Sequence, residues 1–247
     1  MIDQRKQVVR TAVSLLEAGL VSGTAGNVSL REAGTQCFLI TPSAVNYRVM
    51  GEQDIVQVDL LNGSVKGQRR PSTERELHRQ IYKMREDVMA VIHYHSPYAT
   101  AVAVARKTIP NILDEGIDLT PIPTVEYCLA GSPELASNVA ARFAEGRNAV
   151  LLANHGAVVV GGNLKEALNR SLEVERLAQI YCAVPKKGDS GPRTAQSGGE
   201  SEEGRRPAPL GRVPAPEAWV RGEGRDLAAC PARARAFPAS EAARANV

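Results

Sequence analysis

"VMAVIHYHSP", residues 88–97, puts two of the chain's four histidines at the end of an apolar run. Its β-branched and aliphatic residues predict a buried strand over residues 88–95. Side chains two residues apart point to the same face of a strand, so His93 and His95 would face one side and Tyr94 the other. The pair is therefore preset as a two-point chelate for a metal, although histidines at a strand end are more often hydrogen-bonded structural residues.

The segments around this strand alternate between helical and extended patterns. Residues 71–87 predict a helix, with Ser72 or Thr73 as its N-cap. Apolar residues recur in it at helical spacing, at Leu77, Ile81 and Met84. Further helices are expected over residues 4–18, 97–105, 132–146 and 163–184. Further strands are expected over residues 22–31, 36–43, 54–67 (a hairpin that turns at Asn62-Gly63) and 148–161. This mixture predicts a layered α/β domain over residues 1–185.

A third histidine ends another apolar run, in "LLANHGAVVVG". His155 is followed there by Gly156, which lets the backbone turn tightly. Three histidines with an open fourth position are the usual ligands of catalytic zinc, whereas structural zinc sites are closed by four protein ligands, often cysteines. No cysteine lies near these histidines in the sequence. The alternative is that the three are unrelated histidines at strand ends.

Glu74 lies at the start of the helix that precedes the H-x-H strand. A carboxylate in the first turn gains from the helix dipole, and this is the simpler explanation of Glu74. The other is a general acid/base beside a metal, a role that suits a partly buried carboxylate. His78 follows one helical turn later and is expected to pack or form hydrogen bonds rather than bind a metal.

Two small-residue loops, "SGTAGNVS" and "TPSA", carry hydroxyls and free amides that suit a phosphate group. The relevant groups are Gly23, Gly26, Asn27, Ser43 and Ser72. Generic turns would explain either loop by itself. Neither loop has the G-K-[ST] element of a nucleotide P-loop or the G-x-G-x-x-G element of a dinucleotide fold.

Composition indicates a protein of the reducing cytoplasm. No apolar run approaches the ~20 residues that a membrane span requires, and the N-terminus lacks the pattern of a signal peptide. We therefore expect no membrane partner. The cysteines are far apart and form no C-x-x-C pair, which argues against a disulfide scaffold. They are Cys37, Cys128, Cys182 and Cys230.

The net charge of +3 lies wholly in the last quarter of the chain. Residues 1–185 contain 19 basic and 19 acidic residues, and residues 186–247 contain 11 basic and 8 acidic ones. The first segment therefore gives no indication of a nucleic-acid surface. Residues 186–247 are rich in Gly, Pro, Ala and Arg and lack a periodic apolar pattern, so we expect a disordered, solvated tail.

Taken together and in order, five motifs resemble the class II aldolase/adducin family, and most closely its L-fuculose-phosphate aldolase branch. They are "GLVSGTAGNVSLR", "LITPSA", "PSTERELHRQIY", "VIHYHSPYATAVAVA" and "NHGAVVVG". The resemblance covers residues 4–183. It implies a three-layer α/β/α fold with a central, mainly antiparallel sheet, and a homotetramer.

The resemblance also implies the site. One Zn²⁺ per subunit would be held by His93, His95 and His155, with Glu74 as the acid/base. The phosphate-binding loops would contain Gly26, Asn27, Ser43, Ala44, Ser72 and Thr73. Ala44 stands where aldolases commonly have Gly. The family brings a catalytic tyrosine from the region of residues 111–136, where Tyr127 and Glu115 are the candidates to contribute. The tail has no counterpart of the family's C-terminal segment.

The function implied is a zinc-dependent aldolase that cleaves or forms a phosphorylated ketose similar to fuculose 1-phosphate, through a metal-stabilised enediolate of dihydroxyacetone phosphate. Glu rather than Asp at position 74 favours an aldolase over an epimerase of the same superfamily. Other reactions of the superfamily, namely epimerisation, decarboxylation and dehydration, are alternatives. A non-catalytic, adducin-like binding module is a third possibility.

Overall fold

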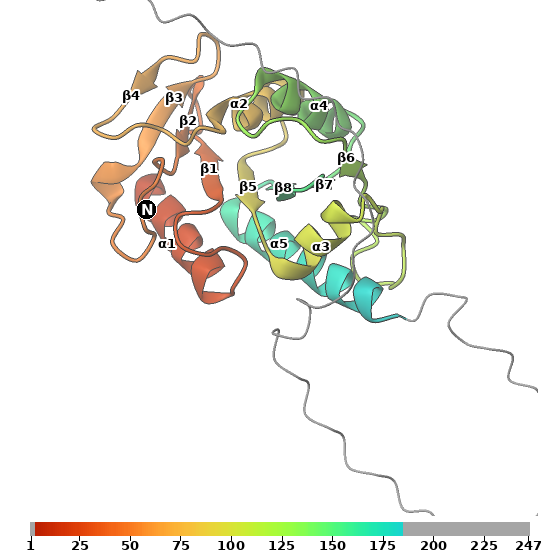
Figure 1. The fold of residues 1–247 in the computed structure, drawn as a ribbon. Coiled ribbons are helices and arrows are strands. Elements are labelled where there is room, and N and C mark those ends of the chain that lie inside the picture. Colours follow the sequence, from red (N-terminus) through yellow and green to blue (C-terminus); the bar gives the residue numbers. More distant parts are fainter. Residues whose placement is uncertain (1–2, 185–247) are drawn as a thin grey trace, which may run out of the picture. The chain divides into compact units, whose positions relative to one another are not determined.

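A single eight-stranded sheet runs through residues 3–184, the part of the chain that the computed structural model describes (Figure 1). The strand order is β4-β3-β2-β1-β5-β8-β7-β6. The strands are β1 (Asn27–Arg31), β2 (Cys37–Ile40), β3 (Val56–Asp59), β4 (Val65–Lys66), β5 (Ala90–Tyr94), β6 (Thr124–Val125), β7 (Ala149–Leu152) and β8 (Gly156–Gly161). All neighbours pair antiparallel except β6 and β7, so the mainly antiparallel sheet is confirmed.

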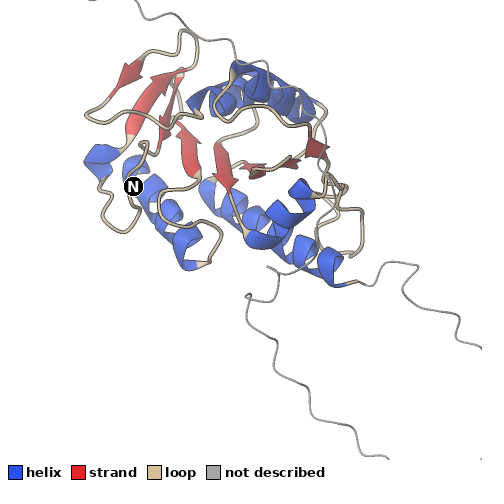
Figure 2. Ribbon diagram, in the orientation of Figure 1, coloured by secondary structure: helices blue, strands red, loops and turns tan. Residues whose placement is uncertain are grey.

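Helices cover both faces of the sheet (Figure 2). They are α1 (Gln4–Glu17), α2 (Arg75–Met84), α3 (Pro97–Val104), α4 (Pro133–Ala144) and α5 (Leu164–Ala183), with a 3₁₀ turn at Glu52–Asp54. Helices α1, α3 and α5 pack into one apolar core, and α2 and α4 pack into a second core on the opposite face. The three-layer α/β/α fold is thus confirmed. The tail expected over residues 186–247 lies outside the described residues.

The central strand β5 alternates between the two cores, as its sequence predicts. Ile92 and Tyr94 belong to the core of α1, α3 and α5, whereas Val91 belongs to the core of α2 and α4. The hydroxyl of Tyr94 donates a hydrogen bond to the Ser171 carbonyl on α5 (3.2 Å). Tyr94 therefore points away from the α2 side, and His93 points toward it.

The start of α2 differs from the prediction. Its N-cap is Glu74, and neither Ser72 nor Thr73 takes that position. Instead the Ser72 hydroxyl accepts a hydrogen bond from the Glu74 amide (3.2 Å), and the Ser72 carbonyl accepts one from the Arg75 amide (3.1 Å). A tight turn therefore occupies the residues that the prediction assigned to the first helical turn. Met84 is also 56% exposed and does not extend the apolar face of α2.

The segment between α3 and α4 contains structure that the sequence pattern did not predict. The short strand β6 pairs parallel with β7, and Ile109 and Ile122 form an isolated antiparallel bridge. Both isoleucines are fully buried, so they anchor an otherwise irregular loop to the core. Within residues 3–184, none of the helices combines the length and the apolar character that crossing a membrane requires.

Candidate metal centre

His93, His95 and His155 meet at the end of β5, although 60 residues separate the pair from the third histidine. The Nε2 atom of His93 lies 2.8 Å from Nε2 of His95 and 3.3 Å from Nε2 of His155. One ligand atom from each residue lies within 4.8 Å of the others. The antiparallel pairing of β5 with β8 causes this convergence, because it brings the end of β5 beside the start of β8.

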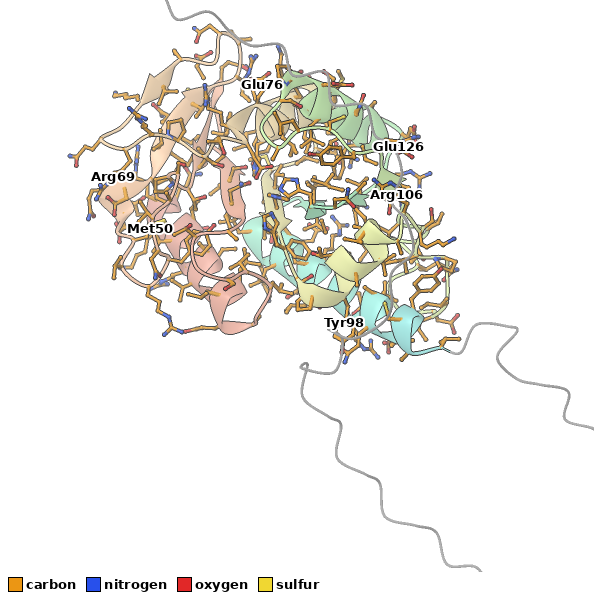
Figure 3. The ribbon with its side chains drawn as sticks, in the orientation of Figure 1. Met50, Arg69, Glu76, Tyr98, Arg106 and Glu126 are labelled. Atoms are coloured by element: carbon orange, nitrogen blue, oxygen red, sulfur yellow. The ribbon has the colours of Figure 1, made fainter. Side chains whose placement is uncertain are left out.

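The backbone at the start of β8 is adapted to this close approach. A Cβ atom at Gly156 would lie 2.3 Å from the Tyr94 carbonyl oxygen and 2.8 Å from Cδ2 of His95. Only glycine fits between the two strand ends. Asn154, which precedes His155, has a φ of 58°, a conformation that asparagine tolerates better than most residues. Arg106, labelled in Figure 3, donates a hydrogen bond to the Asn154 side chain (3.4 Å).

Glu74 faces the same point from the N-terminus of α2. Its Oε2 atom lies 3.1 Å from Nε2 of His93, and its Oε1 atom lies 3.6 Å from Nε2 of His155. Oε2 also accepts a hydrogen bond from the side-chain Nδ2 atom of Asn27 (3.0 Å). Oε1 is buried and has no hydrogen-bond partner among the described residues. An orphaned carboxylate oxygen beside three converging imidazoles is the environment expected of a site for a cation.

The protonation states of His95, His155 and Glu74 suit metal binding. Burial alone would lower the pKa of His93, but contact with Glu74 raises it, so His93 must release its proton to bind a metal ion. Burial, and then the neighbouring His93, lower the pKa of His95 from 6.5 to about 3 and that of His155 from 6.5 to about 4. Burial alone would raise the pKa of Glu74, but His93, His155 and Asn27 together hold it well below its ordinary value. At neutral pH, His95 and His155 are therefore neutral and Glu74 is ionised, which are the forms that bind a metal ion.

The donor set fits zinc better than calcium or magnesium. Imidazole nitrogen suits zinc and other transition metals, whereas calcium and magnesium take oxygen ligands. Three histidines without a fourth protein ligand of the same kind also match the open arrangement of catalytic zinc sites. The residues present therefore fit the ion that the resemblance implies.

The three loops expected to bind phosphate lie side by side. The Val28 amide donates to the Thr41 hydroxyl (3.2 Å), and the Thr41 amide donates to the Val28 carbonyl (3.0 Å). The Ser43 amide donates to the Arg70 carbonyl (2.9 Å), and the Ser72 amide donates to the Thr41 carbonyl (3.1 Å). These bonds tie the segments that contain Gly26, Asn27, Ser43, Ala44, Ser72 and Thr73 into one wall, which leads directly to Glu74.

Gly26 and Ala44 show how tightly this wall is built. A Cβ atom at Gly26 would lie 2.6 Å from the His93 carbonyl oxygen, so the loop passes against the end of β5. Ala44 has a φ of 58°, which is the left-handed conformation that glycine adopts readily. The turn at Ala44 thus keeps the backbone shape that a glycine would have. A Cβ atom at Gly23 would meet nothing within 4 Å, so close packing does not explain the glycine there.

The two residues considered for a further catalytic role lie on the segments before and after β6. Glu115 forms an ion pair with Arg176 on α5. Tyr127 is 55% exposed in the loop after β6. Their predicted roles stay predictions.

The comparison with known proteins agrees with this fold and site. Residues 6–182 match the family model described as the class II aldolase and adducin N-terminal domain. The chain therefore belongs to the class II aldolase and adducin family. Within the family it is a class II aldolase of the fuculose-phosphate aldolase type, and thus a lyase. This finding favours an enzyme over the adducin-like binding module.

The names of individual relatives agree that they are aldolases and differ in the sugar phosphate that they specify. The chain is 37% identical to an L-fuculose phosphate aldolase of Haemophilus influenzae, over 74% of this chain and 84% of that protein. It is 38% identical to a 5-methylthioribulose-1-phosphate/5-deoxyribulose-1-phosphate aldolase of Rhodospirillum rubrum, over 73% of this chain and 80% of that protein. A solved structure of an L-fuculose 1-phosphate aldolase has a TM-score of 0.70 and 38% identity, and the match covers 74% of this chain and 86% of that one.

Reasoning from the sequence missed the polar contacts behind Glu74. Asn27 was considered only as a phosphate ligand, but its side chain bonds to both Glu74 and His78. The spacing of four residues between Glu74 and His78 was visible in the sequence. The pairing of β1 with β5, which brings Asn27 beside His93, was not.

Proposed function

We propose that this protein is a zinc-dependent aldolase that cleaves a ketose 1-phosphate into dihydroxyacetone phosphate and an aldehyde, and that also catalyses the reverse condensation. The observation that carries the proposal is the convergence of His93, His95 and His155 beside the Oε1 atom of Glu74, which has no hydrogen-bond partner among the described residues. The relatives support the substrate class, because their names specify different sugars that share a phosphate.

The three histidines would hold the zinc ion. When bound, zinc supplies Lewis-acid stabilisation of the negative charge that develops on the substrate's carbonyl oxygen. His93 is oriented for this role by the hydrogen bond from its Nδ1 atom to the Ala157 carbonyl (2.9 Å).

Glu74 would move the proton at carbon 3 of the dihydroxyacetone phosphate portion. In the condensation direction, the ionised carboxylate takes this proton at Oε1, and carbon 3 then bonds to the aldehyde carbon. The aldehyde oxygen takes up a proton from solvent and becomes the hydroxyl on carbon 4. In cleavage, that hydroxyl releases its proton to solvent, the bond between carbons 3 and 4 breaks, and its electron pair stays with the dihydroxyacetone phosphate portion as an enediolate. Glu74 then returns a proton to carbon 3. Oε1 suits this role because Asn27 already occupies Oε2.

The loop wall would bind the phosphate and fix the far end of the substrate. Ser43 is half-buried and Thr73 is exposed beside the buried Ser72, so their hydroxyls lie along one wall. The backbone amides of Ser43 and Ser72 hold that wall together. Binding energy from the phosphate would hold carbon 3 near Glu74, which lies one residue after Thr73.

The test is turnover of three candidates by the zinc-loaded protein: fuculose 1-phosphate, 5-deoxyribulose 1-phosphate and 5-methylthioribulose 1-phosphate. Release of dihydroxyacetone phosphate, followed with a coupled dehydrogenase, would support the proposal and identify the preferred sugar. Turnover of none of them by a protein that contains zinc would contradict it.

The homotetramer and the cytoplasmic location stay predictions. Light scattering coupled to gel filtration would measure the mass of the assembly, and a mass near four times 26.4 kDa is the expected result.

A further inference from the structure

A row of buried polar side chains leads away from Glu74 between α2 and β1. Glu74, His78 and Tyr82 are spaced by four residues, so they lie on one face of α2. Asn27 and Ser29 are spaced by two residues, so they lie on one face of β1. None of the five residues is more than 7% exposed.

Hydrogen bonds join the five side chains into a single chain. Asn27 Nδ2 lies 3.0 Å from Glu74 Oε2, and Asn27 Oδ1 lies 2.5 Å from His78 Nε2. The other ring nitrogen of His78, Nδ1, lies 2.6 Å from the Ser29 hydroxyl, which lies 2.7 Å from the Tyr82 hydroxyl. Two polar groups outside the row also contact it: His93 Nε2 lies 3.1 Å from Glu74 Oε2, and the Met89 carbonyl oxygen lies 3.4 Å from the Tyr82 hydroxyl.

The direction of each bond follows from the ionised state of Glu74. A carboxylate only accepts, so Asn27 must present its NH₂ group to Glu74 and its oxygen to His78. His78 Nε2 must therefore carry a hydrogen. A neutral imidazole with a hydrogen on Nε2 accepts at Nδ1, so the Ser29 hydroxyl must donate there. The Tyr82 hydroxyl then donates to Ser29 at 2.7 Å, in preference to the more distant Met89 carbonyl at 3.4 Å.

We propose that His78 is a positioning residue for Glu74: through Asn27 it holds Oε2 and leaves Oε1 as the oxygen that exchanges a proton with the substrate. The proposal rests on the proposed function for the identity of the reaction. It concerns how His78 orients the carboxylate, and His78 itself touches neither substrate nor metal.

The physical reason is the symmetry of the Asn27 amide. Its oxygen and its NH₂ group have nearly the same shape, so a flipped amide would fit the same space. A flip would turn its oxygen toward the carboxylate, which would repel it, and Glu74 would lose its fixed donor. His78 prevents the flip, because its Nε2–H would then face the NH₂ group. Ser29 in turn keeps His78 in the required tautomer.

The first experiment determines the tautomer and requires no turnover. The chain has four histidines, so ¹⁵N-histidine NMR of the zinc-loaded protein gives a simple side-chain spectrum, and His78→Gln identifies the His78 signals. The expected result is a hydrogen on Nε2 and a bare Nδ1. A hydrogen on Nδ1 instead would reverse the direction of the hydrogen bonds on both sides of His78 and overturn the proposal.

The second experiment measures kcat and KM. His78→Leu removes both hydrogen bonds and should lower kcat by about tenfold to a hundredfold with little change in KM, since misplacing a reacting group by 1 Å has effects of this size. His78→Gln keeps a donor and an acceptor and should restore most of kcat. Ser29→Ala, which leaves His78 in place, should lower kcat in the same direction.

The matched control is Val139→Ala, which removes buried volume from α4 in the same core and removes none of the hydrogen bonds of the row. It should destabilise the fold and leave kcat unchanged. The proposal is overturned if His78→Leu and Ser29→Ala lower kcat no more than Val139→Ala does, or if they change only KM. If the wild-type protein turns over none of the sugars, the proposed function fails, and the tautomer still decides whether His78 orients Glu74.

Discussion

The imidazole of His93 donates its Nδ1–H to the carbonyl oxygen of Ala157, at 2.9 Å, across the β5–β8 pair. With Nδ1 engaged, Nε2 is the ring nitrogen left to bind a metal, and it faces the Nε2 atoms of His95 and His155. Bonds of this kind orient metal-binding histidines in proteins. The strand pairing that builds the sheet therefore also sets the orientation of the first ligand.

Metal analysis of the purified protein is the most direct test of this site. We expect about one zinc ion per chain, because three imidazoles and an open position form a single tetrahedral site. His93→Ala and His155→Ala should each lose it, since each leaves only two histidines.

The control for metal analysis is His78→Gln, which removes a histidine that lies outside the cluster and should retain zinc. Zinc binding by the two cluster variants at the wild-type level would contradict the assignment.

Glu74→Gln should lower kcat by about 10² to 10⁴, the usual contribution of a general acid/base, because an amide cannot take up the proton. Zinc content should stay the same, since the three histidines remain. Turnover and metal content are measured on the same preparation.

The matched control is Glu76→Gln on the same helix. Glu76 lies at the periphery of the α2–α4 layer and bonds to Arg79 (Figure 3). The Glu76→Gln variant should keep the wild-type activity. Full activity in Glu74→Gln would show that another group moves the proton.

Local pattern was sufficient to predict much of the fold. The i, i+2 rule predicts that His93 and Tyr94 face opposite sides of β5, and the two cores confirm it. The turn at Asn62-Gly63 was predicted from the dipeptide, and Gly63 has a φ of 73°. These features depend on neighbours in sequence, so sequence patterns report them.

Features that depend on distant partners were not predictable in the same way. The order of strands places β1 between β2 and β5, and this order alone brings Asn27 beside His93 and Glu74. The N-cap of α2 was misassigned because Ser72 bonds to Thr41, a residue 31 positions earlier. The convergence of the histidines was inferred from family resemblance, and β-strand spacing alone could not bring His155 to the other two.

Ala44→Gly should raise the free energy of unfolding by about 1 kcal/mol, because alanine at a φ of 58° is strained and glycine is not. Denaturant unfolding measures the change.

Ala101→Gly is the control, and its expected effect on stability is opposite to that of Ala44→Gly. Ala101 is an exposed residue inside α3, where glycine should cost about 1 kcal/mol relative to alanine. Equal destabilisation by both substitutions would mean that residue 44 does not adopt the left-handed conformation in solution.

Glu175→Ala should destabilise the fold and weaken zinc binding together. The Glu175 carboxylate accepts hydrogen bonds from the Ser96 hydroxyl (2.5 Å) and from the amides of Tyr98 (3.0 Å) and Ala99 (2.8 Å), at the start of α3. Loss of these charge-assisted bonds should cost about 2–3 kcal/mol. Ser96 follows His95 directly in the sequence. If the first residues of α3 lose these bonds and become more mobile, His95 should become more mobile too.

Denaturant unfolding and zinc competition with a chelator measure the two effects of Glu175→Ala. Glu145→Ala is the control, because Glu145 pairs with Arg142 and Arg147 on the surface. It should affect neither property appreciably. Unchanged zinc affinity in Glu175→Ala would show that the position of His95 does not depend on the hydrogen bonds at the start of α3.

His78 should make the protein less stable in acid. Burial, and then the nearby His93, lower its pKa from 6.5 to about 3. Below pH 6.5 the unfolded chain binds a proton at His78, whereas the folded protein does not until the pH approaches 3. Stability from this residue is therefore complete above pH 6.5 and declines as the pH falls, by at most about 1.4 kcal/mol per pH unit.

Comparison with His78→Gln isolates this contribution, because glutamine does not titrate and the other groups are common to both proteins. The wild-type protein should have a stability advantage at pH 7 that shrinks by about 2 kcal/mol at pH 5, as the linkage relation requires. Denaturant unfolding at a series of pH values, with and without zinc, measures it. A difference that stays constant between pH 7 and pH 5 would mean that His78 titrates alike in the folded and unfolded states, which a buried imidazole held between Asn27 and Ser29 should not do.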